Sequence, residues 1–242
     1  MMKRLIFITI VCAFLAVPAW ADLISFADNI AGVDGGAPKY GGTVNWSADD
    51  STVNLNKQSY SLLGGDATVG AYVNGETGVL SHRLTRGLGV YGGEPDEVDR
   101  TNVSGVEHIN ITFDTMPYYV HEIEVRSLFD TDTTGTNAEW AAIAFYKEAV
   151  LLQTAYLKGS EVLNTGDGDA SWTGPSILVD KLVFYVPTKG ELEGAGFNIS
   201  GTYDPGLSEF AVAKLTVTPA PAALMLGMLG LGVAGLKLRK YA

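Results

Sequence analysis

The sequence predicts an all-β protein, a single β-sandwich with a jelly-roll-like arrangement, flanked by an N-terminal signal peptide and a C-terminal transmembrane sorting helix. Three observations lead to the all-β class. Short runs in the middle of the chain alternate apolar and polar side chains, Gly, Asp and Asn separate these runs, and long helical patterns are missing there. Many short strands joined by such turns are typical of sandwiches and barrels.

The clearest predicted strand covers residues 106–113, where Ile109, Ile111 and Phe113 share one face. The same alternation predicts strands at residues 43–46, 52–55, 59–63, 68–73, 118–125, 140–146, 150–157, 177–186, 196–199 and 210–217. Residues 138–157 are rich in Ala, Glu and Leu, so a helix is the alternative for that stretch. With no internal repeat or linker, the strands indicate one domain over residues 22–217.

The first 21 residues have the three parts of a secretory signal peptide. Lys3 and Arg4 give a positive start, residues 5–17 form an uncharged apolar run, and Ala19 and Ala21 give the small-x-small pattern that signal peptidase cleaves. The apolar run is shorter than the roughly 20 residues of a membrane span. We therefore expect cleavage after Ala21, with an uncleaved signal anchor as the alternative.

A second apolar segment covers residues 222–236 and is followed by a basic tail at 237–240. As a helix it would reach only about 22 Å. Flanking residues and bilayer thinning can make up the difference from a hydrocarbon core of about 30 Å. The positive-inside rule places the basic tail in the cytoplasm, so the domain would lie outside the membrane.

Pro219, Ala220 and Pro221 precede this segment, and two prolines at that spacing favour an extended stretch that a protease can bind. The order of Pro-x-Pro, apolar helix and basic end over residues 218–242 resembles the PEP-CTERM sorting signal, with Ala220 in place of the usual Glu. The resemblance implies processing by an exosortase, a membrane-embedded cysteine transpeptidase of bacteria that make exopolysaccharide. A plain C-terminal anchor and a glycosylphosphatidylinositol signal are the alternatives; the basic end disfavours the latter.

The domain between the two signals is strongly acidic and free of thiols. Five of the 16 basic residues lie in the signals, which leaves 11 against 27 acidic residues and a net charge of −16. Such a charge argues against nucleic acid and anionic membrane surfaces as partners. The single cysteine, Cys12, lies in the signal peptide, so the domain has neither a disulfide nor a cysteine nucleophile.

Four carboxylates form a candidate calcium site: Asp96, Glu97, Asp99 and Glu107. Glu107 is in phase with the apolar residues of its strand, so its side chain should face the core, where a carboxylate needs a partner. Ca²⁺ takes six to eight oxygen ligands and would supply one. The alternative is a solvated loop in which Glu107 pairs with Arg100.

These features predict an exported, exosortase-processed protein of the cell surface or extracellular matrix, with a structural or binding role and an association with exopolysaccharide. We expect no enzyme, since nucleophile-elbow and phosphate-loop motifs are missing. The alternatives are a secreted polysaccharide hydrolase and a calcium-stabilised adhesin-like module on a plain membrane anchor. Aromatic residues that could stack on sugar rings are Tyr91, Tyr118, Tyr119, Trp140 and Trp172.

Overall fold

The computed structural model describes residues 22–25, 57–62, 65–83, 87–91, 97–101, 105–130, 138–159, 161–162, 168–199 and 203–220. Its elements are β1 (Asp22–Ser25), β2 (Lys57–Leu62), β3 (Gly65–Val73), β4 (Glu76–Thr77), β5 (Val79–Arg83), β6 (Gly87–Tyr91), β7 (Val98–Thr101), β8 (Gly105–Phe113), β9 (Tyr118–Arg126), β10 (Phe129–Asp130), β11 (Trp140–Lys147), β12 (Val150–Lys158), β13 (Glu161–Val162), β14 (Ala170–Val179), β15 (Lys181–Tyr185), α2 (Lys189–Gly194), the 3-10 turn η1 (Pro205–Leu207) and β16 (Glu209–Pro219).

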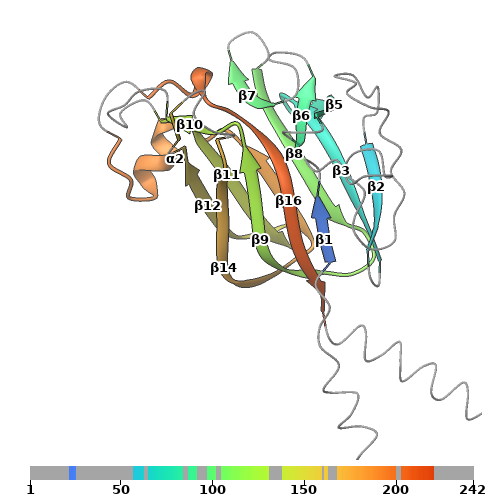
Figure 1. Ribbon diagram of the computed structural model, residues 1–242. Coiled ribbons are helices and arrows are strands. Elements are labelled where there is room, and N and C mark those ends of the chain that lie inside the picture. The colour runs from blue at the N-terminus through green and yellow to red at the C-terminus, as the bar shows by residue number, and fades with distance from the viewer. Residues whose placement is uncertain are drawn as a thin grey trace, which may run out of the picture.

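The predicted all-β class is confirmed, and the strands form two antiparallel layers that face each other (Figure 1). The first layer contains β14, β9, β16, β6 and β5, with β1 beside β16. The second contains β12, β11, β15, β8, β3 and β2. Strand β7 pairs with β8 and with β16, so it joins the layers along one side of a sandwich-like fold.

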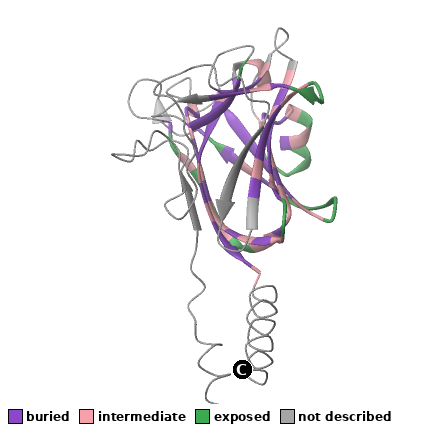
Figure 2. Ribbon diagram, turned by 90° about the vertical axis from the view of Figure 1, so that its right-hand side faces the viewer, coloured by how far each residue is buried: buried purple, intermediate pink, exposed green. Residues whose placement is uncertain are grey.

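The core lies between the layers and comes from every second residue of the central strands. In β8 the predicted alternation is confirmed, because Ile109 and Ile111 are fully buried and Phe113 is nearly so. Ile123 and Val125 of β9 are fully buried in the same core, opposite them. Figure 2 shows this pattern as buried residues along the strands, with exposed residues at a hairpin tip and on α2.

Strand β16 brings the two ends of the domain together. It pairs with β1 in the register Asp22↔Val217 and with β9 in the register Val217↔Val120. Because β1 and β16 are antiparallel, the first residue of β1 lies beside the C-terminal residues of β16. Both therefore lie at the same pole of the sandwich (Figure 1).

The helix alternative for residues 138–157 is wrong, because this stretch is the β11–β12 hairpin. Glu148 and Ala149 form its tip with positive φ values of 51° and 63°, the backbone that a tight hairpin turn requires. Helix propensity at Ala and Leu is a weak preference, and pairing with β15 and burial of Ile143 and Phe145 override it.

Two other predicted strands differ from the structure. Residues 177–186 are not one strand, because Asp180 separates β14 from β15, which belong to different layers. Residues 196–199 are not a strand. They form the end of a turn and an irregular segment after α2. A capping box begins α2: the Glu191 N–H donates to Thr188 Oγ1 at 3.2 Å and the Thr188 N–H donates to Glu191 Oε2 at 2.7 Å.

The remaining predicted strands divide into two groups. Those at 68–73, 106–113, 118–125, 140–146, 150–157 and 210–217 are confirmed as parts of β3, β8, β9, β11, β12 and β16, and the one at 59–63 is confirmed in β2 up to residue 62, the last described residue there. The strands predicted at 43–46 and 52–55 lie outside the described residues. Strand β16 continues to Pro219, beyond the predicted domain boundary at residue 217.

Candidate functional site: a polar groove on the outer face of the second layer

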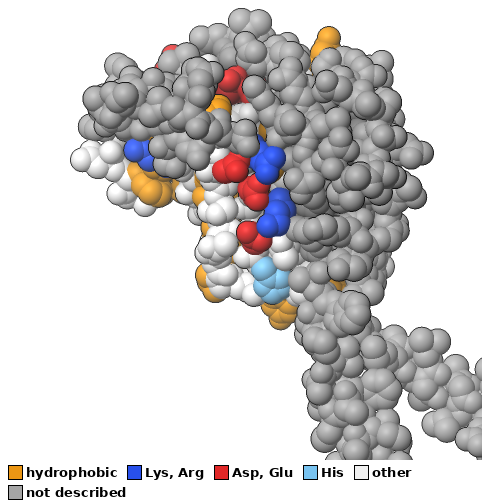
Figure 3. Space-filling view, in the orientation of Figure 1, with side chains coloured by type: hydrophobic (Ala, Val, Ile, Leu, Met, Phe, Trp, Pro, Cys, Tyr) orange, Lys and Arg blue, Asp and Glu red, His pale blue; other side chains and the backbone are white. Residues whose placement is uncertain are grey.

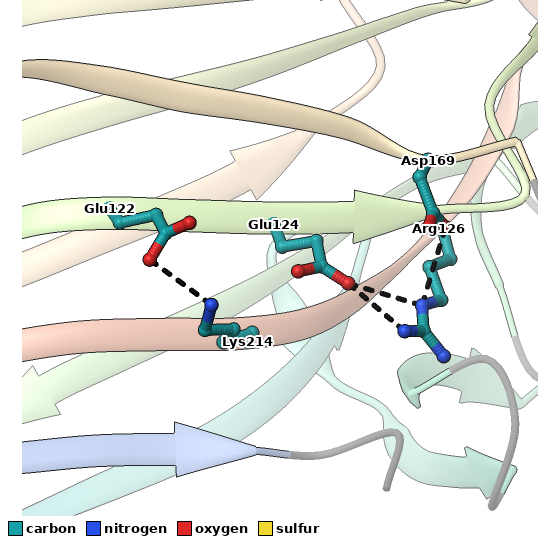
Figure 4. Close-up of polar contacts among 5 residues, drawn as sticks. All are labelled: Glu122, Glu124, Arg126, Asp169 and Lys214. Carbon is teal, nitrogen blue, oxygen red and sulfur yellow. Dashed lines mark hydrogen bonds and ion pairs between the residues drawn. The ribbon is translucent and has the colours of Figure 1, made fainter.

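The outer face of the first layer carries a row of ion pairs along β9 and β16 (Figures 3 and 4). Lys214 contacts Glu122 at 3.1 Å, and Arg126 contacts Glu124 at 3.1 Å and Asp169 at 3.3 Å. Pairs this open to solvent contribute about 0–1 kcal/mol each. Both cations therefore have carboxylate partners, and the charges of these described residues are satisfied among themselves.

His121 lies on the same face, between two hydroxyl groups. Its Nδ1 is 2.8 Å from Ser176 Oγ and its Nε2 is 2.8 Å from Thr218 Oγ1. A serine beside an imidazole is the first half of a nucleophilic arrangement, but the third member there is usually a carboxylate that stabilises the imidazolium. Thr218 is neutral and cannot do so. His121 therefore acts here as a link between β9, β14 and β16.

The second layer has a groove on its outer face, lined by side chains of β8 and β15, by Tyr146 of β11 and by residues of the adjoining turns. Asn110 of β8 and Val183 of β15 pair across the two strands, and both line it. The open volume of the groove is about 650 Å³.

His108 lines one end of the groove. His108 pairs with Tyr72 on one side and with Tyr185 on the other. The rings of His108 and Tyr72 stack at 5.1 Å with only 6° between their planes. Burial, and then the charge of Lys181, lower the pKa of His108 below its usual value. The ring is therefore neutral at pH 7 and offers one donor and one acceptor.

Further along the groove the lining comes from Thr112, Lys181 and Tyr146, which also pair across strands. The Lys181 ammonium lies 5.9 Å from the centre of the Tyr146 ring. Two carboxylates stand at the rim, and each holds a local structure: Asp114 Oδ2 accepts a hydrogen bond from Thr68 Oγ1, and Asp180 Oδ2 accepts one from the Glu148 N–H. Both residues line the groove.

Asn110 is the polar residue at the floor of the groove, with only 8% of its surface exposed. Its Oδ1 is buried and has no hydrogen-bond partner within the described part of the chain. A buried acceptor left unpaired costs roughly 1–3 kcal/mol. The unpaired acceptor therefore destabilises the fold at this groove. A hydroxyl or amide donor of a bound ligand would remove that cost.

The segment that follows α2 packs against the outer face of β11 and β12. The ring of Phe197 lies 4.9 Å from that of Trp140 and 5.7 Å from that of Tyr156. Tyr185 Oη donates to Glu191 Oε1 at 3.3 Å. Burial and the Glu191 charge raise the pKa of Tyr185, so its hydroxyl stays protonated as a donor.

The aromatic residues predicted from the sequence do not gather at the groove. Tyr118 and Trp140 are buried, Trp172 packs on Phe145 at 4.8 Å, and Tyr91 is exposed on β6 of the other layer. The groove instead uses Tyr146 and His108. Alternation places both on the outer face, but only the pairing of β11, β15 and β8 shows that they share one trough.

The candidate calcium ligands are only partly described. Asp96 lies outside the described residues, whereas Glu97, Asp99 and Glu107 are all buried, with at most 2% of each residue exposed. The Asp99 N–H donates to Glu107 Oε2 at 3.2 Å. Over the described ranges, no three or more His, Cys, Asp or Glu side chains are arranged to hold a metal ion. With Asp96 outside those ranges, the calcium site stays a prediction.

The sorting motif begins where β16 ends. Pro219 is buried and pairs with Tyr118, and the Ala220 N–H donates to Pro117 O at 3.3 Å. Pro221, residues 222–236 and the cleavage residues Ala19 and Ala21 lie outside the described part of the chain. Among the helices that the structure does describe, none is long and apolar enough to cross a membrane.

Comparisons with protein-family models, with curated proteins and with solved structures found nothing that matches this chain. The proposed function therefore rests on the residues of this chain.

Proposed function

We propose that this chain is an exported, non-enzymatic protein of the bacterial cell surface or extracellular matrix, processed by signal peptidase at one end and by an exosortase at the other. One observation carries the proposal: Asp22 and Val217 are neighbours on paired strands. The residue expected to become the mature N-terminus and the residues that lead into the sorting motif therefore leave the sandwich at one pole.

This arrangement suits two enzymes that both act at the membrane. Asp22 is the first residue of β1 and directly follows the expected cleavage after Ala21. At the other end, β16 reaches Pro219, so the Pro-x-Pro motif starts at the edge of the folded domain. A domain with both sites at one pole can be cleaved at each end without unfolding or turning over.

The finer parts of the proposal concern topology. We place residues 222–236 in the membrane as the sorting helix, with the basic tail at 237–240 in the cytoplasm. The sandwich, for which we propose a jelly-roll-like arrangement, lies outside until the exosortase releases it from the membrane. A plain membrane anchor is the alternative, and it would keep the helix.

A binding role fits the groove better than hydrolysis does. A glycosidase needs two carboxyl groups that reach the sugar from both sides of the scissile bond. Asp114 and Asp180 stand at the rim, but Thr68 and the Glu148 N–H already engage them. Release of reducing ends by the purified protein, abolished in Asp180→Asn, would establish the hydrolase instead.

The test of sorting is the intact mass of the protein from its host, with and without exosortase. We expect an N-terminus at Asp22 in both strains and loss of the apolar segment and basic tail only where exosortase is present. A Pro219→Ala/Pro221→Ala variant should keep the tail in both strains. A full-length C-terminus in the exosortase-containing strain would reject the sorting and leave the plain anchor.

A further inference from the structure

We propose that the groove over β8, β15 and β11 binds a segment of a neutral polysaccharide chain. The inference deepens the proposed function, since it rests on export for access to such a polymer and names the ligand class of the binding role. The argument uses the shape of the groove, its hydrogen-bonding groups and its charge.

The shape suits a linear polymer. The lining residues of β8 run from His108 to Phe113, a length of about 17 Å at the usual rise per residue of a strand. Longer side chains border the groove, with His108 at one end and Lys181 and Tyr146 beside Thr112 near the other. An extended chain can therefore lie along the trough, whereas a compact ligand would fill only part of it.

The hydrogen-bonding groups suit hydroxyls. A sugar hydroxyl can donate and accept at the same time, so it fits a surface where donors and acceptors alternate. The floor and walls offer the Asn110 amide, the neutral His108 ring and the Thr112 hydroxyl. A ligand hydroxyl that donates to Asn110 Oδ1 would satisfy the acceptor left unpaired at the floor. The Tyr146 ring offers an apolar surface for a sugar ring.

The charge favours a neutral polymer over an anionic one. Lys181 already lies over the Tyr146 ring, and the two rim carboxylates, Asp114 and Asp180, stand beside it. The domain between the signals has a net charge of −16. A polymer of uronate or phosphate groups would meet repulsion from the rim and from the domain as a whole.

The opposite outer face is a natural internal comparison. There the cations Lys214 and Arg126 pair with carboxylates, and His121 has a partner at each ring nitrogen. The groove differs because a buried acceptor at its floor is unpaired within the described residues. Of these two outer faces, the one with the groove is thus the face with a polar group that a ligand would satisfy.

The test is native affinity electrophoresis of the processed protein, or of the full chain in detergent, through gels that contain laminarin, dextran, galactomannan, xyloglucan or anionic alginate. We expect at least one neutral polysaccharide to retard the protein. Asn110→Ala and Tyr146→Ala should each lower the apparent affinity at least tenfold. Tyr91→Ala removes an exposed aromatic residue outside the groove and should leave the affinity unchanged.

Thermal unfolding shows whether the variants keep the fold. Asn110→Ala removes an unpaired buried acceptor, so its melting temperature should not fall. Migration unchanged in all four neutral gels, retardation by alginate alone, or retardation kept by both groove variants would overturn the proposal. Sorting is judged separately, since the mass of the C-terminus does not enter this measurement and binding does not enter the mass measurement.

Discussion

Glu107 Oε2 accepts a hydrogen bond from the Asp99 backbone N–H at 3.2 Å, inside the sandwich where neither side chain has significant contact with solvent. Burial, and then the charge of Asp99, raise the pKa of Glu107 to about 8. Glu139 is in a similar position: burial, and then the charge of Glu97, raise its pKa to about 8, against the lowering effect of a hydrogen bond from the Phe129 N–H.

The two carboxyl groups predict a domain that loses stability as pH rises. In the unfolded chain each would titrate near 4.5, whereas in the folded protein each titrates near 8. The stability from keeping them protonated is fully present below about pH 4.5 and is lost as pH rises towards 8. Urea unfolding should show a fall on the order of 1 kcal/mol per pH unit for each group between these limits.

The matched variants are Glu107→Gln and Glu124→Gln. Glutamine at 107 keeps the acceptor for Asp99 but cannot ionise, so this variant should exceed the stability of the wild type by on the order of 3 kcal/mol at pH 9 and come close to it at pH 5. Glu124→Gln, in the surface ion pair with Arg126, should change stability by less than about 1 kcal/mol at either pH. A wild type equally stable at pH 5 and pH 8 contradicts the raised pKa values.

The alternation of residues 106–113 was enough to predict the inward direction of Glu107, because a strand has a period of two. It could not predict the partner. Asp99 lies on β7, and the β7–β8 pairing depends on register rather than on an apolar pattern. Arg100, the partner in the alternative to the calcium site, is the next residue along the strand, so a one-residue difference in register decides which group meets Glu107.

The groove could not be predicted for a related reason. Lys181 and Tyr146 meet because β15 pairs with β11, and Asn110 lies beside them because β15 also pairs with β8. Both pairings join segments distant in sequence, and the charged pair Asp180-Lys181, which interrupts the apolar residues of 177–186, did not by itself show that the chain turns there from one layer to the other. Local periodicity gives the face of each residue, whereas a groove depends on the order of strands.

The calcium prediction can be tested against the same carboxylates. If Ca²⁺ binds Asp96, Glu97, Asp99 and Glu107, it must displace the proton that Glu107 holds when folded. The melting temperature in millimolar CaCl₂ should then exceed that in chelator by several degrees at pH 8, and by less at pH 5, where protons compete. Equal melting temperatures in calcium and chelator at pH 8 remove the site.

Where β6 meets β16, we expect the backbone at Gly87 not to tolerate a side chain. Its φ is +124°, and a Cβ added there would lie 2.3 Å from the Val212 carbonyl oxygen. Gly87→Ala should therefore cost on the order of 2 kcal/mol of unfolding free energy, since either the backbone or the β16 pairing has to shift. Urea denaturation at pH 6 would measure this loss.

Gly190 provides the matched control for that substitution. It lies in α2, and a Cβ there would meet nothing within 4 Å. Gly190→Ala should be neutral or should stabilise the protein by up to about 1 kcal/mol, because Ala is the better helix former. If the two variants have equal stability, the close approach of Gly87 to Val212 is not a constraint on the fold.

We expect the exposed edge of β12 to promote self-association of the protein. It is the last strand of its layer, and three successive apolar residues are exposed along it: Val150 by 61%, Leu151 by 50% and Leu152 by 47%. A register shift near Phe145 leaves Leu152 without a partner in the β11 pairing, so side chains of both strand faces are exposed. An apolar edge strand is a template for pairing with another chain.

Leu151→Lys places a charge on that edge at little cost to the fold, with an expected change in unfolding free energy within about 0.5 kcal/mol. Sedimentation velocity at increasing concentration should show less association for this variant than for the wild type. Leu157→Lys, on the same strand but only 9% exposed, is the contrasting change and should unfold the domain, because its side chain belongs to the core. If Leu151→Lys associates as much as the wild type does, contact between molecules is made by another surface and the exposed edge of β12 is harmless.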